Sequence, residues 1–139
     1  MAKLTVSDVD LTGKTVLVRV DFNVTFHPGT NEIADDSRID ATLPTLQLLL
    51  SQDCKLVLCS HLGRPHGEVV DSLRMAPVSQ RLSEKLSIDV LQMSGSIGSE
   101  VSSNVKAMNP RDIIMLENLR FHPEEEANDP DFSKSLASL

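Results

Sequence analysis

Four short apolar runs separated by amphipathic segments set the pattern of this 139-residue chain. A β-branched run at Val16–Val20 and an almost wholly apolar run at Lys55–Ser60 predict two buried strands. Asp89–Met93 predicts a weaker strand and Asp112–Leu116 a fourth. Strands without a polar face are typical of a sheet that is covered on both sides.

Apolar residues three or four positions apart predict helices between and after these runs. The segments are Asp40–Ser51, Met75–Leu86, a short stretch from Val101 to Met108, and a last helix with Asp129 as N-cap, Pro130 at its first position and Phe132, Leu136 and Leu139 on one face. Pro44 falls early enough in the first helix to be tolerated in a first turn. Asp35–Arg38 is interpreted as a turn before that helix.

Helices between apolar strands this close in sequence imply right-handed crossovers and a parallel sheet. The predicted fold class is α/β, a Rossmann-like three-layer α/β/α arrangement with a mainly parallel sheet, in one domain over residues 1–139. A last helix with no strand after it leaves a sheet edge uncovered, so we expect a truncated sequence. Cys54 and Cys59, an odd number of positions apart, should face opposite sides as buried free thiols.

Ligands of open parallel sheets bind where the strands end, so the residues after each strand are the first candidates for a site. Three loops carry Asp21, Phe22 and Asn23 after the first strand, His61, Leu62, Gly63 and Arg64 after the second, and Arg120 after the fourth. Arg38 can reach the same rim from its turn. We therefore predict cationic and hydrogen-bonding groups at one edge of the sheet.

Arginine at this edge favours a small anionic ligand, because its planar fork of donors binds two oxygens of a phosphate or carboxylate at once. Asp21 and Asn23 suit hydroxyl groups, and Gly63 would let the backbone approach a ligand closely. No Gly-rich phosphate loop is present. Glu124–Glu126 is interpreted as a solvated loop or helix start and the remaining histidines as surface residues, so no metal site is predicted.

Composition and charge exclude several classes of partner. A formal net charge of -7 argues against nucleic acid and anionic lipid, which bind clustered Lys and Arg. No apolar run approaches the roughly 20 residues needed to cross a bilayer. The first residues contain Asp8 and Asp10 and no basic-then-apolar order, so we expect a cytoplasmic protein without a signal peptide.

Five stretches resemble the phosphoglycerate kinase family in wording and order: VLVRVDFNV, DDSRI, SHLGRP, LENLRFHPEEE and NDPDF. The resemblance covers nearly the whole chain, and the stretch between Thr25 and Asp35 is longer than the family pattern. It implies a partial N-terminal domain that binds 3-phosphoglycerate. A separate C-terminal domain, which would bind nucleotide, is expected to be absent from this chain.

The resemblance also implies roles for residues. The substrate site would comprise Asp21, Phe22, Asn23, Arg38, His61, Leu62, Gly63, Arg64 and Arg120, with Arg38 catalytic. The implied reaction, a step of glycolysis, transfers a phosphoryl group between ATP and the carboxylate of 3-phosphoglycerate. Mg-ATP would be the cofactor of the intact enzyme, bound by no residue present here, and the fragment alone would be inactive. We expect the full-length protein to be a monomer.

Two other functions are compatible with the sequence. One is a non-catalytic anion-binding or scaffold protein of the same fold, which uses the basic rim for another ligand or a partner chain. The other is a receiver-like or flavin-binding domain, suggested by the alternation of strands and helices alone. A flavin site normally needs aromatic cover, and this chain has four Phe and no Trp or Tyr.

Overall fold

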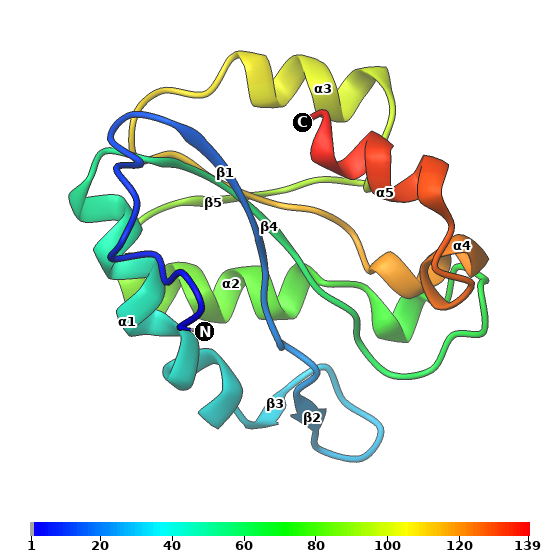
Figure 1. The fold of residues 1–139 in the computed structure, drawn as a ribbon. Helices are drawn as coiled ribbons and strands as arrows, with labels where there is room; N and C mark the ends of the chain where they lie inside the picture. Colours follow the sequence, from blue (N-terminus) through cyan, green and yellow to red (C-terminus); the bar gives the residue numbers. More distant parts are fainter. Residues whose placement is uncertain (1) are drawn as a thin grey trace.

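Four parallel strands between two layers of helices form the centre of the structure, a computed structural model that describes residues 2–139 (Figure 1). The strands of the main sheet are β1 (Thr15–Arg19), β4 (Lys55–Cys59), β5 (Val90–Gln92) and β6 (Ile113–Met115). The helices are α1 (Ser37–Ser51), α2 (Ala76–Leu86), α3 (Ser99–Lys106), α4 (Pro123–Glu126) and α5 (Pro130–Ala137). Single 3₁₀ turns lie at Asp71–Leu73 and Leu119–Phe121.

The strand order β1-β4-β6-β5 places β4 in the interior of the sheet. Leu56 and Leu58 of β4 pack into one apolar core, whereas Val57 and Cys59 pack into a second core on the opposite face. This two-sided burial explains why β4 is a continuous apolar run and not an alternating one. The edge strands are less covered, and Leu17 of β1 and Leu91 of β5 are partly exposed.

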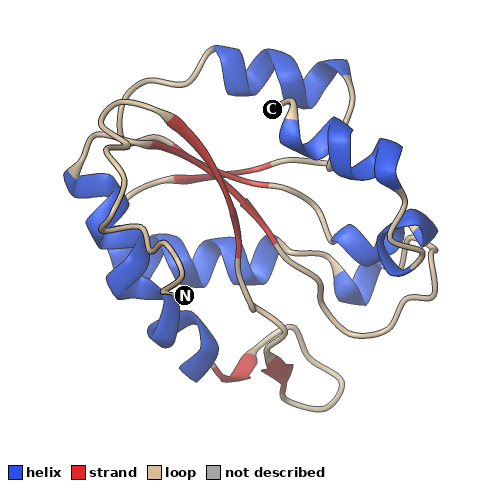
Figure 2. Ribbon diagram, viewed as in Figure 1, coloured by secondary structure: helices blue, strands red, loops and turns tan. Residues whose placement is uncertain are grey.

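Helices α1 and α2 cover one face of the sheet, and α3 and α5 cover the other (Figure 2). The predicted α/β/α fold with a parallel sheet is therefore confirmed. Cys54 and Cys59 are buried free thiols in different cores, as predicted. Asp129 is the N-cap of α5, where its side chain accepts a hydrogen bond from the Phe132 N–H at 2.8 Å. None of the helices in the described part of the chain could span a bilayer.

Helix α1 starts earlier than predicted, at Ser37, so Arg38 lies in its first turn and not in a turn before it. The Asp35 side chain accepts a hydrogen bond from the Ser37 N–H at 2.8 Å, which orders the entry into the helix. Pro44 consequently lies inside the helix, beyond its first turn. It lacks the N–H that would bond the Asp40 carbonyl, and both residues are exposed, so water can satisfy that group.

The segment between β1 and α1 contains a hairpin that the sequence pattern did not predict. Strands β2 (Thr25–Phe26) and β3 (Ile33–Asp35) pair antiparallel, apart from the main sheet. Phe26 and Ile33 pack against the core under α1 and α2. The hairpin thus brings the start of α1 beside the end of β1, where Arg38 pairs with Asp21.

Candidate anion-binding site

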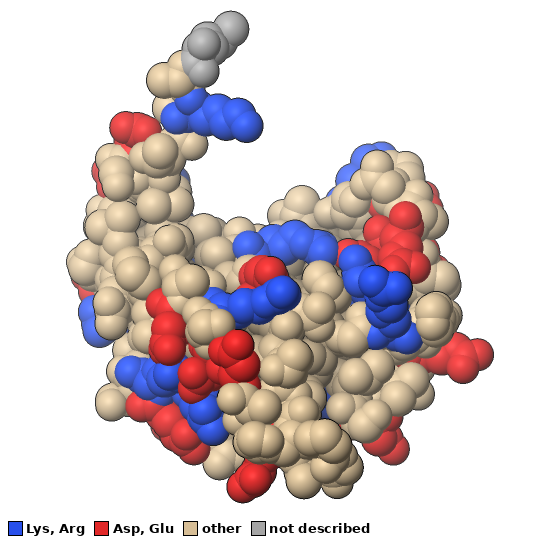
Figure 3. Space-filling model, turned by 90° about the horizontal axis from the view of Figure 1, so that it is seen from below, with Lys and Arg blue, Asp and Glu red and all other residues tan. Residues whose placement is uncertain are grey.

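The predicted site residues lie at the carboxyl edge of the parallel sheet, the lower side of Figure 1. Asp21 and Asn23 follow β1, His61–Arg64 follow β4, and Arg120 follows β6. Arg38 reaches the same edge from the first turn of α1, where it pairs with Asp21. Figure 3 views the molecule from this side and shows Lys and Arg side chains across the middle of the face, with Asp and Glu between them.

Arg38 and Asp21 form an ion pair across this edge. The Arg38 Nη1 donates to both carboxylate oxygens of Asp21, at 2.9 and 3.0 Å. Both side chains are about half exposed or more, at 51% and 63%. Water screens such a pair strongly, so a ligand can take over part of the Arg38 fork at small cost.

A small hollow of about 120 Å³ lies beside this pair, lined by Asn23, Val24, Thr25, Asp35, Ser37 and Arg38. It combines an amide, a carboxylate, hydroxyl groups and a guanidinium in a space that suits a few polar atoms. The hairpin β2–β3 and the first turn of α1 form most of its wall.

Asn23 ties the loop after β1 to the loop after β4. Its Oδ1 accepts a hydrogen bond from the Gly63 N–H at 2.9 Å, which orients the Asn23 amide and leaves its NH₂ donors for a ligand. Gly63 has a positive φ of +62°, and a Cβ there would lie 2.7 Å from Leu73 Cδ2. The positive φ therefore favours glycine at position 63, and a Cβ there would push the end of the Leu73 side chain aside, a reason that stands beside the predicted close approach of a ligand.

Asn118 is fully buried beneath the site and was not singled out from the sequence. Its Oδ1 accepts hydrogen bonds from the N–H groups of Leu62 and Arg120 at 3.2 and 3.1 Å. Its Nδ2 donates to the carbonyl oxygens of Leu62 and Leu73 at 2.8 and 3.0 Å. One amide thus fixes the loop after β4 relative to the loop after β6. Its place in the loop that follows the fourth predicted strand was its one signal in the sequence.

Arg120 and Arg19 share one carboxylate, that of Glu125. Arg19 Nη2 lies 2.6 Å from Glu125 Oε1, and Arg120 Nε lies 3.2 Å from Oε2. Burial alone would raise the pKa of Glu125, but the hydrogen bonds from the two arginines outweigh it and lower that pKa. Glu125 is thus charged and only 10% exposed, so the expectation that the whole Glu124–Glu126 run is solvated is wrong at this residue.

Arg19 is a member of the site that sequence reasoning missed. It falls within the Val16–Val20 run that predicts the first strand, and it is the last residue of β1, so it lies at the edge where ligands of parallel sheets bind. Its side chain is 53% exposed. The predicted arginines of the site are Arg38, Arg64 and Arg120, and together with Arg19 they come from segments that are far apart in the chain.

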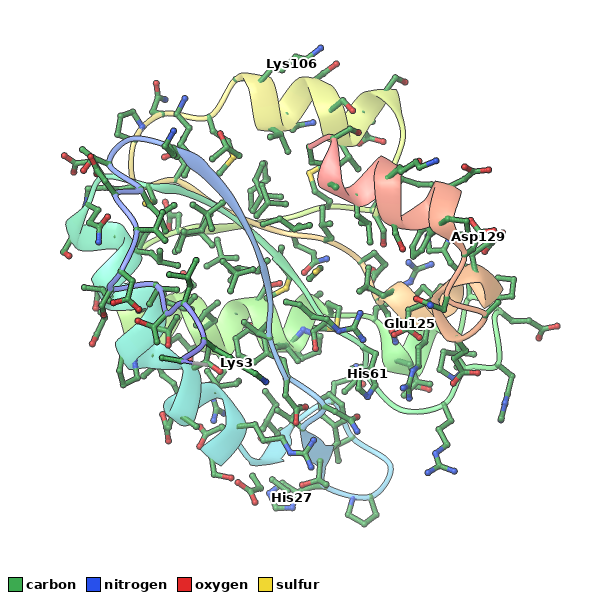
Figure 4. All side chains as sticks on the ribbon, in the orientation of Figure 1. Lys3, His27, His61, Lys106, Glu125 and Asp129 are labelled. Atoms are coloured by element: carbon green, nitrogen blue, oxygen red, sulfur yellow. The ribbon has the colours of Figure 1, made fainter. Side chains whose placement is uncertain are left out.

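His61 is half-buried next to these arginines, and Figure 4 shows it below the sheet on the loop after β4. Burial lowers the pKa of His61, and the positive charge of Arg120 lowers it further. Glu125 and Asp21 act in the opposite direction, and Arg19 acts with Arg120. A bound anion would favour the imidazolium form, so ligand binding and protonation of His61 should be linked.

Phe22 and Leu62 have buried side chains, at 0% and 1% exposure, and belong to the core under α1 and α2. The Phe22 N–H donates to Ser60 Oγ and the Leu62 N–H to Asn118 Oδ1, so these amides are already engaged. Both residues support the loops that carry the polar groups. Arg64 is exposed on the same loop as His61.

The fold and this edge together define a class of protein: a parallel α/β domain with arginine side chains gathered at the carboxyl ends of its strands, where ligands of such sheets bind. The model of the family "Phosphoglycerate kinase" matches residues 6–139. The chain belongs to the phosphoglycerate kinase family. This family assignment agrees with the resemblance drawn from the five sequence stretches.

Individual relatives give the same result. The phosphoglycerate kinase of Microcystis aeruginosa is 50% identical over 141 residues, a match that covers 99% of this chain and 35% of the relative. That of Moorella thermoacetica is 48% identical over 139 residues, covering 100% and 35%. The chain therefore spans about a third of the length of the curated relatives it matches.

Solved structures agree as well. The phosphoglycerate kinase structure from Coxiella burnetii superposes with a TM-score of 0.80 at 33% identity, covering 98% of this chain and 33% of the other. The crystal structure from Pyrococcus horikoshii OT3 gives 0.82 at 28% identity, covering 98% and 34%.

Proposed function

We propose that this chain forms the 3-phosphoglycerate site of a phosphoglycerate kinase. The observation that carries the proposal is the gathering of Arg19, Arg38, His61 and Arg120 at one sheet edge of a protein whose net charge is -7. Such a local cationic site in an acidic chain suits a small polyanion. Family membership supplies the particular anion.

3-Phosphoglycerate carries a phosphate at one end, a carboxylate at the other and a hydroxyl between them. In our proposal Arg120, Arg64 and His61 bind the phosphate, while Asp21 and the Asn23 amide donors bind the hydroxyl. Phe22, Leu62 and Gly63 contribute through the backbone geometry of their loops. The carboxylate then lies toward Arg38, which pairs with Asp21.

In the proposed reaction a carboxylate oxygen of 3-phosphoglycerate attacks the γ-phosphorus of ATP, and the bond from that phosphorus to the bridging oxygen of ADP breaks. The products are 1,3-bisphosphoglycerate and ADP. Such a transfer needs in-line positioning and positive charge near the transferring oxygens. Arg38 would supply that charge, which is worth on the order of 10³ in rate or more for an arginine in this role.

The Mg-ATP of this reaction is assigned to no residue of the chain. Within residues 2–139 no group of three or more His, Cys, Asp or Glu side chains is placed to hold a metal ion. We propose that nucleotide binds to a further domain of the intact enzyme, and that the 139 residues alone bind substrate without turning it over.

Calorimetric titration of the 139-residue chain with 3-phosphoglycerate tests the proposal. Arg38→Ala and Arg64→Ala should each weaken binding by roughly 10-fold or more, because each removes charge-assisted hydrogen bonds to the ligand. Lys106→Ala is the matched control, since Lys106 lies on α3 at the opposite end of the molecule (Figure 4). If the unaltered chain and the three variants gave equal heats of binding, the assignment of Arg38 and Arg64 to the site would be wrong. Equal affinity for inorganic phosphate and 3-phosphoglycerate would favour the non-catalytic anion-binding alternative.

A further inference from the structure

Glu125 joins two arginines that reach the site from the ends of different strands. Arg19 ends β1, Arg120 follows β6, and Glu125 lies in the short helix α4 after them. The contact between Arg19 and Glu125 spans 106 residues of sequence. The Glu125 side chain is 10% exposed, compared with 60% for its neighbour Glu126. Its carboxylate is therefore held inside the rim, not on the outer surface.

The guanidinium nitrogens that contact Glu125 determine which nitrogens remain available to bind a ligand. Arg120 turns its Nε toward Glu125, at 3.2 Å, and toward Glu126, at 3.5 Å. The two Nη atoms of Arg120 take no part in these contacts. Arg19 uses Nη2 alone. A carboxylate bound at Nε fixes the plane of the guanidinium. The two terminal nitrogens of that guanidinium then keep the fork geometry that binds phosphate.

The backbone on both sides of this contact is also fixed. The Arg120 N–H donates to Asn118 Oδ1, and the Arg120 carbonyl accepts from the Gly67 N–H at 3.2 Å. The Glu125 N–H donates to the His122 carbonyl at 3.1 Å. A long side chain that is held at both its backbone and its head loses little further freedom when a ligand binds.

We propose that Glu125 is a positioning residue of the anion site, which holds Arg19 and Arg120 in the orientation that an anion requires. This rests on the proposed function only in the choice of 3-phosphoglycerate as the natural ligand. Glu125 also neutralises part of the repulsion between two cations that would otherwise spread apart without ligand. An anion can bind the Arg120 Nη pair while Glu125 stays in place.

The opposite role, a carboxylate that competes with the ligand, makes a different prediction. A competitor would occupy the terminal nitrogens and its removal would tighten binding. Glu125 takes Nε of Arg120 and one terminal nitrogen of Arg19, so it leaves the Arg120 fork for a ligand, and it is largely buried, which together favour the role of a support. Removing a support makes the ligand immobilise two freed arginines, a loss of about 10-fold in affinity.

The test is titration of the 139-residue chain and its variants with inorganic phosphate and with 3-phosphoglycerate. Glu125→Ala should weaken binding of both by about 10-fold. Glu125→Gln keeps one acceptor oxygen in a side chain of the same shape, so it should bind both anions more tightly than Glu125→Ala does. It also replaces the alanine variant in the test if that variant folds poorly. Glu124→Ala, an exposed neighbour in the same run, should bind like the unaltered chain.

A nuclear magnetic resonance readout separates positioning from a general effect on folding. The Arg120 Nε–H should exchange slowly with solvent in the unaltered chain and rapidly in Glu125→Ala, while backbone amides in the sheet keep their protection. Unchanged or tighter phosphate binding by Glu125→Ala and Glu125→Gln would overturn the proposal. A chain that binds 3-phosphoglycerate no better than phosphate would refute the proposed function alone, since the phosphate series still decides the role of Glu125.

Discussion

Replacing Asn118 with alanine should test how the site is held together. The substitution removes one buried amide and with it four hydrogen bonds to neighbouring loops. The bonds to the Leu62 N–H and the Leu62 carbonyl are fully buried, so neither group can turn to water. Those to Leu73 and Arg120 are partly buried, and water can restore some of what is lost there.

The magnitude follows from the two fully buried groups. Each buried group left without a partner costs about 1–3 kcal/mol, so for two such groups we expect Asn118→Ala to lower the free energy of unfolding by about 2–6 kcal/mol. That is a large share of the roughly 5–15 kcal/mol typical of a domain. Asn118→Asp keeps the shape and the Oδ1 acceptor, but it replaces the Nδ2 donors with a second, charged oxygen that faces the carbonyl oxygens of Leu62 and Leu73. It should therefore be at least as destabilising.

Urea unfolding followed by circular dichroism measures this difference. Asn31→Ala is the control, because Asn31 is exposed in the β2–β3 loop and its replacement should change stability by less than about 0.5 kcal/mol. In the folded fraction of Asn118→Ala, affinity for 3-phosphoglycerate should fall as well, since the loops of His61 and Arg120 lose their shared anchor. A change in unfolding free energy as small as that of the control would refute the reasoning.

Two further predictions concern titratable groups. Because the pKa of His61 is lowered on folding from 6.5, the unfolded chain binds more protons just below that value, so stability should rise with pH through this window. His61→Gln should flatten that part of a pH series of urea melts, and an unchanged slope would contradict the assignment. Burial raises the pKa of Cys59 to about 11 and raises that of Cys54, so neither thiol should react with a disulfide reagent at pH 8 until urea unfolds the chain. Rapid labelling of the folded chain would show that the two cores open readily.

The sheet and the rim of the site could be predicted from sequence because their signals are local. Each main strand contains a short run of apolar residues, and the rule that ligands bind at strand ends then selects the loops of Asp21, His61 and Arg120. The hairpin β2–β3 could not be predicted, since strands of two and three residues carry no periodicity and depend on packing of Phe26 and Ile33 against the core.

The residues that support the site, Arg19, Asn118 and Glu125, could not be predicted from the sequence for a different reason. Glu125 sits in a run of three acids that resembles any solvated helix start, and only the folded chain brings Arg19 to it. Arg19 itself looked like a polar residue within a strand. Asn118 could be seen as a polar residue after a buried run, but nothing local indicates that its amide serves two separate loops.

The contacts that assemble the site have a consequence for its biosynthesis. Gly63 and Asn23 are 40 residues apart, Leu62 and Asn118 are 56 apart, and Arg19 and Glu125 are 106 apart. The ribosome must therefore synthesise most of these 139 residues before Arg19 and Glu125 can form their contact. At the usual rate of translation, about 5–20 residues per second, Glu125 is synthesised several seconds or more after Arg19.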